Sequence, residues 1–252
     1  MLLMIALGFS EQFFILVACT TIHELAHILA ARLFGLSCKK VTFTALGEMA
    51  EINGFEEISL YKRLIILFAG VAVNFAIAVF SKNNLVVLIN TALIILNILP
   101  VYPLDGGKIV YYILCYLLGV LRANKISFYM GIILIYGIIV LGFFQIMVYS
   151  YNISLFCMGI YLLKINKREY IKKGFSIYKM LINKKINKIS KINFLYVSKD
   201  TNVKDVLSRL CWDYYLIIYV ENLVINQGEF IEYIINYGIN GTVKDVLLAN
   251  QT

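Results

Sequence analysis

Long apolar runs alternate with short polar segments over the first two thirds of the chain. A helix that crosses the hydrocarbon core of a bilayer takes about 20 residues, and four of the runs reach or approach this length. A fifth, shorter run suggests one more span. The expected spans are residues 12–34, 60–80, 85–99, 126–149 and 153–165. This pattern predicts a multi-pass α-helical membrane protein with about five to six transmembrane segments.

Two segments between these runs predict other structure. Residues 41–55 alternate in part, contain β-branched residues and carry an Asn53–Gly54 turn signal, which together predict a short β-hairpin. Because non-helical backbone at membrane depth is tolerated only against protein or a wet cavity, we expect the hairpin to re-enter the membrane beside such a cavity. Residues 106–121 would rise only about 24 Å as a helix, which leaves their path ambiguous.

The chain changes character near residue 166, where the apolar runs give way to a mixed, soluble-looking pattern. The tail reads as strand, helix, strand, short strand and helix, which predicts a small α+β domain. The expected organisation is therefore an intramembrane domain over residues 1–165, a basic linker over 166–190 and a tail domain over 191–252.

Composition supports the membrane assignment. Of the 252 residues, 61% are hydrophobic and 15% are charged, with a mean hydropathy of +0.80. Ordinary soluble domains are about 45–50% apolar and about 25% charged. This excess of apolar residues excludes an ordinary soluble protein.

The net charge of +8 is concentrated after the last apolar run. Basic residues in this stretch are Lys164, Lys167, Arg168, Lys172, Lys173, Lys179, Lys184, Lys185, Lys188 and Lys191. Such a stretch marks the cytoplasmic end of a span and attracts anionic lipid, so we expect no nucleic-acid partner. If residues 106–121 lie along or dip into one membrane face, all major basic clusters share the cytoplasmic side. The tail is then cytoplasmic, and Asp105, which follows the run over 85–99, lies at the cytoplasmic end of that span.

The five cysteines include no CxxC pair, so neither a disulfide framework nor a cysteine zinc site is expected. The N-terminus lacks the basic region and cleavage site of a signal peptide, and we expect its apolar segments to be retained.

Three ionisable residues interrupt the first long apolar run in the sequence HELAH: His23, Glu24 and His27. A charged group inside a membrane helix costs a few kcal/mol or more, which indicates a functional site. Two histidines four residues apart project from one helix face and can converge on zinc, while the adjacent glutamate reaches the water on the metal. The alternative is a polar face that hydrogen-bonds to neighbouring helices.

A catalytic zinc takes three protein ligands and keeps one open position. The best third candidate is Asp105 in NILPVYPLDGGK, where Pro100 and Pro103 end a helix and Gly106 lets the backbone approach closely. Asp105 alone could instead be the N-cap of the next helix. Its combination with the HELAH segment favours the metal.

HELAH and the later NILPVYPLDGG resemble the site-2 proteases, a family of intramembrane zinc metalloproteases. The resemblance implies one Zn²⁺ per chain held by His23, His27 and Asp105, with Glu24 as the general base. Residues 69–74 are similar to a further family motif, usually Gly-Pro-x-x-Asn, with Val71 in place of proline. We expect Asn74, Asn97 and Pro103 to contact the substrate, although an interhelical hydrogen bond is an equal alternative for Asn97.

Within the family, the sporulation branch resembles the chain over nearly its whole length. Compared with that branch, we expect the N-terminus to be short by most of one span. That branch implies a membrane-tethered substrate, a sporulation pro-sigma factor that loses its pro-sequence, and membrane proteins that inhibit or regulate the protease. It also implies a bacterial inner membrane or the mother-cell membrane around the forespore.

The tail resembles a single CBS domain, which implies ATP or another adenine nucleotide as a ligand and pairing into a homo-oligomer. Two alternatives remain. The same chemistry can act on signal-peptide or secreted-peptide precursors, and a non-proteolytic membrane protein can sense nucleotide through such a tail.

Overall fold

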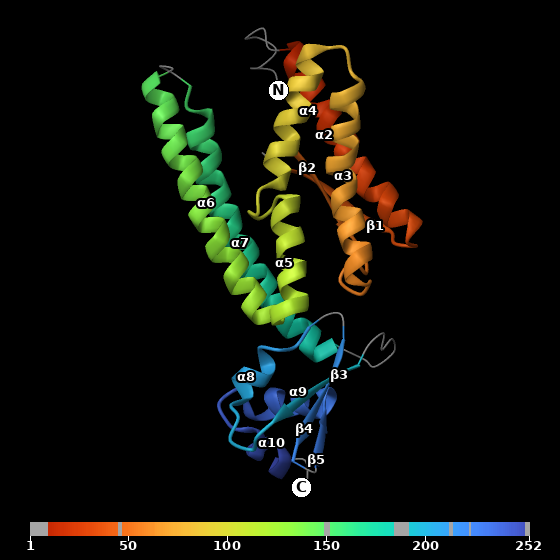
Figure 1. The fold of residues 1–252 in the computed structure, drawn as a ribbon, viewed down its shortest axis with the longest axis vertical. Coiled ribbons are helices and arrows are strands. Elements are labelled where there is room, and N and C mark those ends of the chain that lie inside the picture. The colour runs from red at the N-terminus through yellow and green to blue at the C-terminus, as the bar shows by residue number, and fades with distance from the viewer. Residues whose placement is uncertain are drawn as a thin grey trace. The chain divides into compact units, whose positions relative to one another are not determined.

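A computed structural model describes residues 10–44, 47–148, 152–183, 192–211, 214–221 and 223–249 (Figure 1). By its internal contacts the chain forms two compact units. The first comprises residues 1–100 and 104–109, and the second comprises residues 101–103 and 110–252. The expected boundaries near residues 165 and 190 do not coincide with this division.

Three helices build the first unit: α2 (Ser10–Leu33), α3 (Leu60–Phe80) and α4 (Asn84–Ile98). The three helices pack against one another: α2 contacts both α3 and α4, and α3 contacts α4 (Figure 1). Large apolar side chains point outward from them, and Leu29 and Phe75 are about three fifths exposed. Surfaces of this kind suit lipid as the surrounding solvent.

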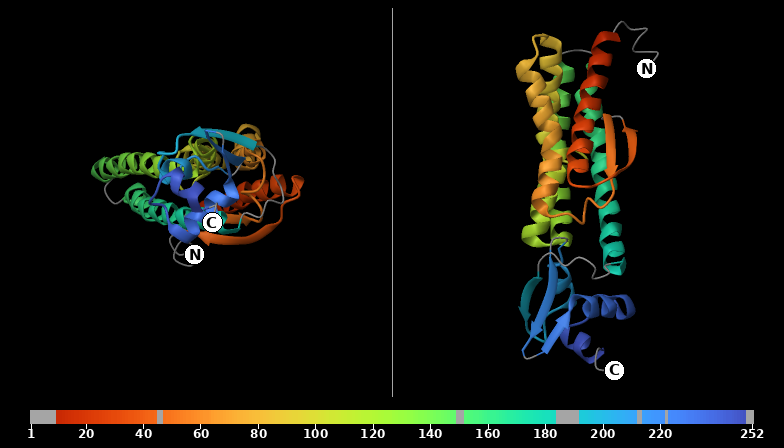
Figure 2. Two further views of the ribbon diagram at one scale, coloured as in Figure 1. Left: turned by 90° about the horizontal axis from the view of Figure 1, so that it is seen from below. Right: turned by 90° about the vertical axis from the view of Figure 1, so that its right-hand side faces the viewer.

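A β-hairpin lies beside α2, formed by β1 (Cys38–Thr44) and β2 (Gly47–Ile52) in antiparallel register (Figure 2). The predicted hairpin is present, but its expected turn is wrong. Thr44 pairs with Gly47, so the strands connect through residues 45 and 46, which lie outside the described part of the chain. Asn53–Gly54 instead ends the second strand, because Gly54 has a φ of 71° and its carbonyl accepts from Glu57 N.

Buried Arg63 ties this turn to the start of α3. Its guanidinium donates to the carbonyls of Ile58 and Glu56 at 2.9 and 3.3 Å. The hairpin is thereby anchored at both ends to the helices that carry it.

The helix after α4 begins only after an interruption. Leu99 is extended, as expected for a residue before proline, and the peptide bond between Tyr102 and Pro103 is cis. Helix α5 (Asp105–Leu118) then follows, and a Cβ at its second residue, Gly106, would clash with the Ile98 carbonyl oxygen. The two prolines thus end one helix, and the glycine lets the next begin close against it.

This interruption corrects two expectations about depth. Helix α4 has 15 residues and extends only about 22 Å, which is too short for a full span. Asp105 contacts His23, the fourteenth residue of the 24-residue α2. Asp105 therefore lies level with the middle of the first long helix and not at the end of a span.

The second unit contains most of α5 together with α6 (Val120–Val148) and α7 (Ser154–Asn183). Helices α6 and α7 pack closely where glycines remove side-chain bulk: a Cβ at Gly142 would lie 2.6 Å from Phe156 N. Asn166 is buried in this interface and donates to the Phe128 carbonyl at 3.2 Å.

Helix α7 gives the first part of the expected linker a helical structure. It does not end near residue 165 but continues to Asn183, so residues 166–183 are helical. Lysine and arginine are good helix formers, and the stretch holds no proline and a single glycine, Gly174, which is tolerated. The basic segment therefore continues helix α7.

The tail forms the predicted order of elements as a three-stranded sheet with helices. Parallel β3 (Ile192–Val197) and β4 (Tyr215–Val220) are followed by antiparallel β5 (Leu223–Asn226). The helices are α8 (Val203–Leu207), α9 (Gln227–Tyr237) and α10 (Val243–Ala249). Alternate residues of the central strand, among them Leu216 and Ile218, are buried. The whole protein is therefore mostly helical, with a small α+β tail.

Three helices in the described ranges are long and apolar enough to cross a membrane: residues 11–33 of α2, together with α3 and α6. The expected span over 126–149 begins earlier, at Val120. The apolar start of α7 is shorter than a full span, as expected from the sequence. The total of five to six transmembrane segments stays a prediction.

Candidate metal centre

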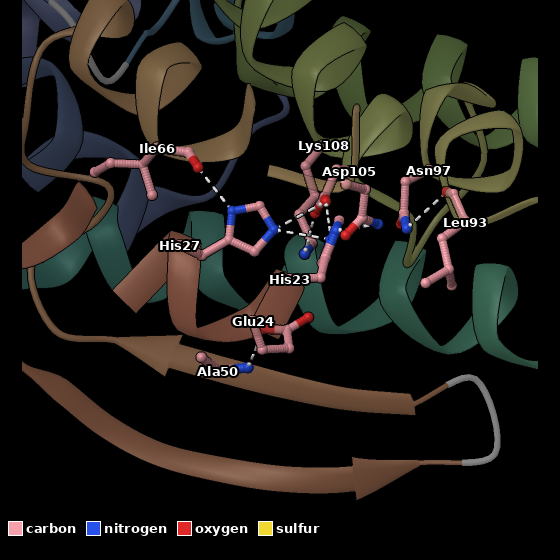
Figure 3. Close-up of polar contacts among 10 residues, drawn as sticks. His23, Glu24, His27, Ala50, Ile66, Leu93, Asn97, Asp105 and Lys108 are labelled. Atoms are coloured by element: carbon pink, nitrogen blue, oxygen red, sulfur yellow. Dashed lines mark hydrogen bonds and ion pairs between the residues drawn. The ribbon is translucent and has the colours of Figure 1, made fainter. Parts of the chain in front are cut away.

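Two imidazoles meet on one face of α2. His23 and His27 lie one helical turn apart, and their Nε2 atoms are 3.1 Å from each other (Figure 3). Both residues are buried, with 5% of their surface exposed. The i, i+4 spacing brings the two rings together, as the sequence pattern predicts.

Asp105 supplies the third ligand atom from the start of α5. Its Oδ2 lies 3.0 Å from Nε2 of His23 and 3.0 Å from Nε2 of His27. Asp105 is almost fully buried, and its other oxygen, Oδ1, lies 3.1 Å from the Lys108 ammonium. The structure thus brings together the three residues that the sequence nominates, from segments 78 residues or more apart.

Hydrogen bonds fix the orientation of the His27 ring. Its Nδ1 lies 2.7 Å from the Ile66 carbonyl oxygen on α3. A carbonyl can only accept, so Nδ1 carries the proton and donates, and Nε2 of the neutral ring has a free lone pair. That lone pair points at the Asp105 oxygen and at the other imidazole.

His23 has a similar partner on its far side. The Asn74 side-chain amide lies 3.0 Å from His23 Nδ1 and is fully buried. Its Oδ1 has no hydrogen-bond partner among the described residues. A half-turn of the amide presents Oδ1 to the ring, where it accepts from Nδ1–H and leaves the Nε2 lone pair free.

This arrangement fits a zinc ion. Zinc binds imidazole nitrogen and carboxylate oxygen at about 2.0–2.1 Å, so adjacent ligand atoms of a tetrahedral site lie about 3.3 Å apart. The observed separations of 3.0, 3.0 and 3.1 Å are close to that value. Three lone-pair donors that face one another need a cation between them, and the two imidazoles and one carboxylate match a catalytic zinc set.

Gly70 is a site residue that the sequence reasoning missed. A Cβ there would lie 2.5 Å from His27 Nε2 and 2.6 Å from His23 Cε1. Helix α3 can approach both imidazoles only because this residue has no side chain. The signal was available in the motif-like segment 69–74, since an isolated glycine within an apolar helix usually has a packing reason.

Glu24 faces the hairpin. One carboxylate oxygen, Oε2, accepts from the backbone N–H of Ala50 on β2 at 3.2 Å (Figure 3). The side chain is half-buried, and no other hydrogen bond to it occurs among the described residues. Strand β2 thus holds the carboxylate that follows His23 in the chain.

The three residues expected to contact substrate lie in different environments. Asn74 is buried, with its amide against His23, and its substrate contact stays a prediction. Asn97 is half-buried and donates to the Leu93 carbonyl of its own helix at 3.1 Å. Pro103 is buried after the cis peptide bond. Substrate contacts of Asn97 and Pro103 stay predictions.

Comparison with known proteins bears on this centre. The model of peptidase family M50 matches residues 12–88 and 81–138, together half of the chain and including the three candidate ligands. The zinc metalloprotease MJ0392 of Methanocaldococcus jannaschii is 26% identical over 215 residues, covering 77% of this chain. The match spans only 59% of that relative's length.

Two further comparisons agree. Stage IV sporulation protein FB of Bacillus subtilis is 21% identical over 216 residues, covering 80% of this chain and 74% of that protein. The solved site-2 protease from Methanocaldococcus jannaschii is 25% identical, with a TM-score of 0.53, and the match covers 67% of this chain and 85% of that structure. The resemblance drawn from HELAH and LDGG is confirmed: the chain belongs to peptidase family M50 and is similar to the site-2 proteases.

Proposed function

We propose that the protein is an intramembrane zinc metalloprotease that hydrolyses a peptide bond in or near the membrane segment of a tethered protein. The observation that carries this proposal is the buried convergence of His23, His27 and Asp105 halfway along an apolar helix, with Glu24 beside them. Three ionisable groups in such a place are costly unless they serve a site.

The residues have separate parts in the proposed reaction. His23, His27 and Asp105 would hold zinc, which when bound acidifies a water and polarises the scissile carbonyl. Glu24 accepts the proton from the attacking water and passes it to the leaving amine. The Ala50 N–H donates to Glu24 Oε2 and so fixes the orientation of that carboxylate while the other oxygen takes the proton. Ile66 and Asn74 keep the imidazoles in position from behind.

The finer proposal concerns the substrate. We propose a membrane-tethered regulatory protein, with a sporulation pro-sigma factor as the first candidate, cleaved to remove its pro-sequence. What supports it is similarity to the Bacillus subtilis sporulation protein over most of this chain. Signal-peptide or secreted-peptide precursors are the alternative substrates for the same chemistry. We propose access from the cytoplasmic side, supported by the basic residues around Arg122 and along α7.

The tail is proposed as a separate regulatory domain joined to the membrane domain through α7. Its order of strands and helices is compatible with the CBS-like domain predicted from the sequence. Adenine nucleotide binding, homo-oligomer formation and inhibitory membrane partners stay predictions. A purely nucleotide-sensing protein is a weaker proposal, because it gives no use to the buried histidine–aspartate cluster.

Metal analysis and a single substitution test the proposal. The full chain, purified in detergent, is expected to hold one zinc per chain. Co-expression with a sporulation pro-sigma factor is expected to yield the shortened product. Glu24→Gln should retain zinc and lose cleavage by about a hundredfold or more, because general acid–base catalysis contributes that much. Glu11→Gln, at the exposed start of the same helix, is the matched control.

Two results would contradict this function. One is a purified chain without zinc, and the other is undiminished cleavage by Glu24→Gln. Cleavage of a signal-peptide precursor in place of the pro-sigma factor would keep the chemistry and change the substrate.

A further inference from the structure

The two oxygens of Asp105 have different partners. Oδ2 faces the two imidazoles, 3.0 Å from each Nε2, whereas Oδ1 lies 3.1 Å from Lys108 Nζ. The carboxylate is thus shared between the candidate metal position and a lysine on the same helix. We propose that Lys108 is a positioning residue that confines Asp105 to binding zinc through Oδ2 alone. This inference rests on the proposed zinc site.

The first turn of α5 sets this contact. Asp105 is the first residue of the helix, and Lys108 follows three residues later on the same face. The Lys108 backbone N–H donates to the Leu104 carbonyl at 3.1 Å, so the turn is already helical there. Asp105 has 3% of its side chain exposed, and the lysine has 27%. The ammonium thus reaches a buried carboxylate from a side chain that is itself only partly exposed.

Burial separates this pair from an ordinary surface ion pair. Exposed i, i+3 pairs contribute little to stability, because water screens them and both side chains lose freedom. Here the carboxylate is out of water, where an oxygen left without a hydrogen-bond partner is destabilising. Lys108 donates to Oδ1. Because that oxygen already has a partner, we expect it not to coordinate the metal.

Coordination number gives the contact a chemical consequence. A catalytic zinc with three protein ligands keeps one position for water or substrate. A carboxylate that binds through both oxygens would fill that position or crowd it. An ammonium suits this task because it is a compact point charge that donates hydrogen bonds. With Oδ1 bonded to Lys108, three donor atoms remain, one from each ligand residue, and the fourth position stays open.

Lys108→Met tests the inference, because methionine keeps the length and apolar stem but removes the charge. Cobalt(II), substituted for zinc, reports coordination number through the intensity of its visible absorption. We expect Lys108→Met to weaken that absorption, as a second Asp105 oxygen joins the metal. Zinc affinity, measured by competition with a chelator, should change by about tenfold or more, as is typical when a partner of a ligand is removed.

Two further variants keep the test sharp. Lys108→Arg retains a donor for Oδ1 and is expected to keep the wild-type cobalt spectrum. Lys82→Met removes a lysine between α3 and α4, away from the described centre, and should change neither measurement. Circular dichroism of each variant confirms that it is folded, and Lys108→Arg supplies the comparison if the methionine variant unfolds.

The outcomes separate this inference from the proposed function. If the wild-type chain binds one zinc and Lys108→Met leaves both the cobalt spectrum and the zinc affinity unchanged, the role of Lys108 is wrong and the protease proposal stands. If the wild-type chain binds no zinc or cobalt, both proposals fail together.

Discussion

At the scale of single residues, Gly70 sets how closely α3 can approach the two imidazoles. Gly70→Ala would place a methyl group 2.5 Å from His27 Nε2, so at least one imidazole must move. We expect zinc content per chain to fall several-fold and cleavage to fall with it, as measured by metal analysis and the pro-protein assay. Gly137→Ala on α6 is the control, because nothing lies within 4 Å of that position. Full zinc in Gly70→Ala would show that the helices can separate without cost.

Asn74 allows a second prediction, about proton positions. If its amide oxygen accepts from His23 Nδ1–H, Asn74→Asp preserves the acceptor and should hold zinc at least as tightly. Asn74→Leu removes it, and zinc affinity should fall by about 10–100-fold, the usual cost of losing such a partner. Chelator competition on both variants measures the difference. Equal affinities for the two variants would mean that Asn74 only fills space behind His23.

The ligand residues could be predicted from the sequence, whereas their supports could not. His23, Glu24 and His27 stand out because ionisable residues are rare in an apolar run. The Ile66 carbonyl and Lys108 carry no such signal, since every residue has a carbonyl and lysines are common near membranes. Their roles depend on which helices pack together, and that is set by tertiary contacts.

At the scale of elements, the interruption between α4 and α5 determines where Asp105 lies. Hydrophobicity locates the apolar runs, yet it cannot show that the run over 85–99 stops halfway along its neighbours. Neither α4 nor α5 alone reaches about 30 Å, because they extend about 22 and 21 Å. Together they are long enough for one interrupted crossing. The hairpin shows the same limit of sequence patterns. Alternation predicted its strands, but the turn between them does not lie at Asn53–Gly54.

Gly106→Ala tests the interruption directly. The added methyl would lie 2.2 Å from the Ile98 carbonyl oxygen, and backbone atoms cannot move aside as a flexible side chain can. We expect the start of α5 to shift and zinc affinity to fall by at least about tenfold. Gly174→Ala on α7, which has open space around it, should bind zinc normally. Zinc affinity equal to wild type in Gly106→Ala would show that Asp105 does not depend on this close approach.

At the scale of the whole molecule, the number of crossings determines which side holds the tail. If α4 and α5 make one crossing together, then α2, α3, α4 with α5, α6 and α7 cross five times in alternating directions. The basic residues near Lys39, Lys62 and Arg122 then share one side with the segment after α7, and Lys82 lies opposite. On this topology the predicted sidedness is kept for a different reason, because residues 106–121 would complete a crossing and would not lie along one face. The positive-inside tendency makes the shared side cytoplasmic.

Cysteine accessibility measures this topology. In a background without the five native cysteines, Lys82→Cys should react with a membrane-impermeant maleimide added to intact cells, because the residue faces outside. Ser198→Cys in the tail should react only after the cells are opened, and labelling both after lysis controls for reactivity. Labelling of Ser198→Cys in intact cells would place the tail outside, and cleavage of a cytoplasmic pro-protein would then be impossible. If both positions are labelled only after lysis, Lys82 lies on the same side as the tail. In that case α4 and α5 do not form one crossing antiparallel to α3.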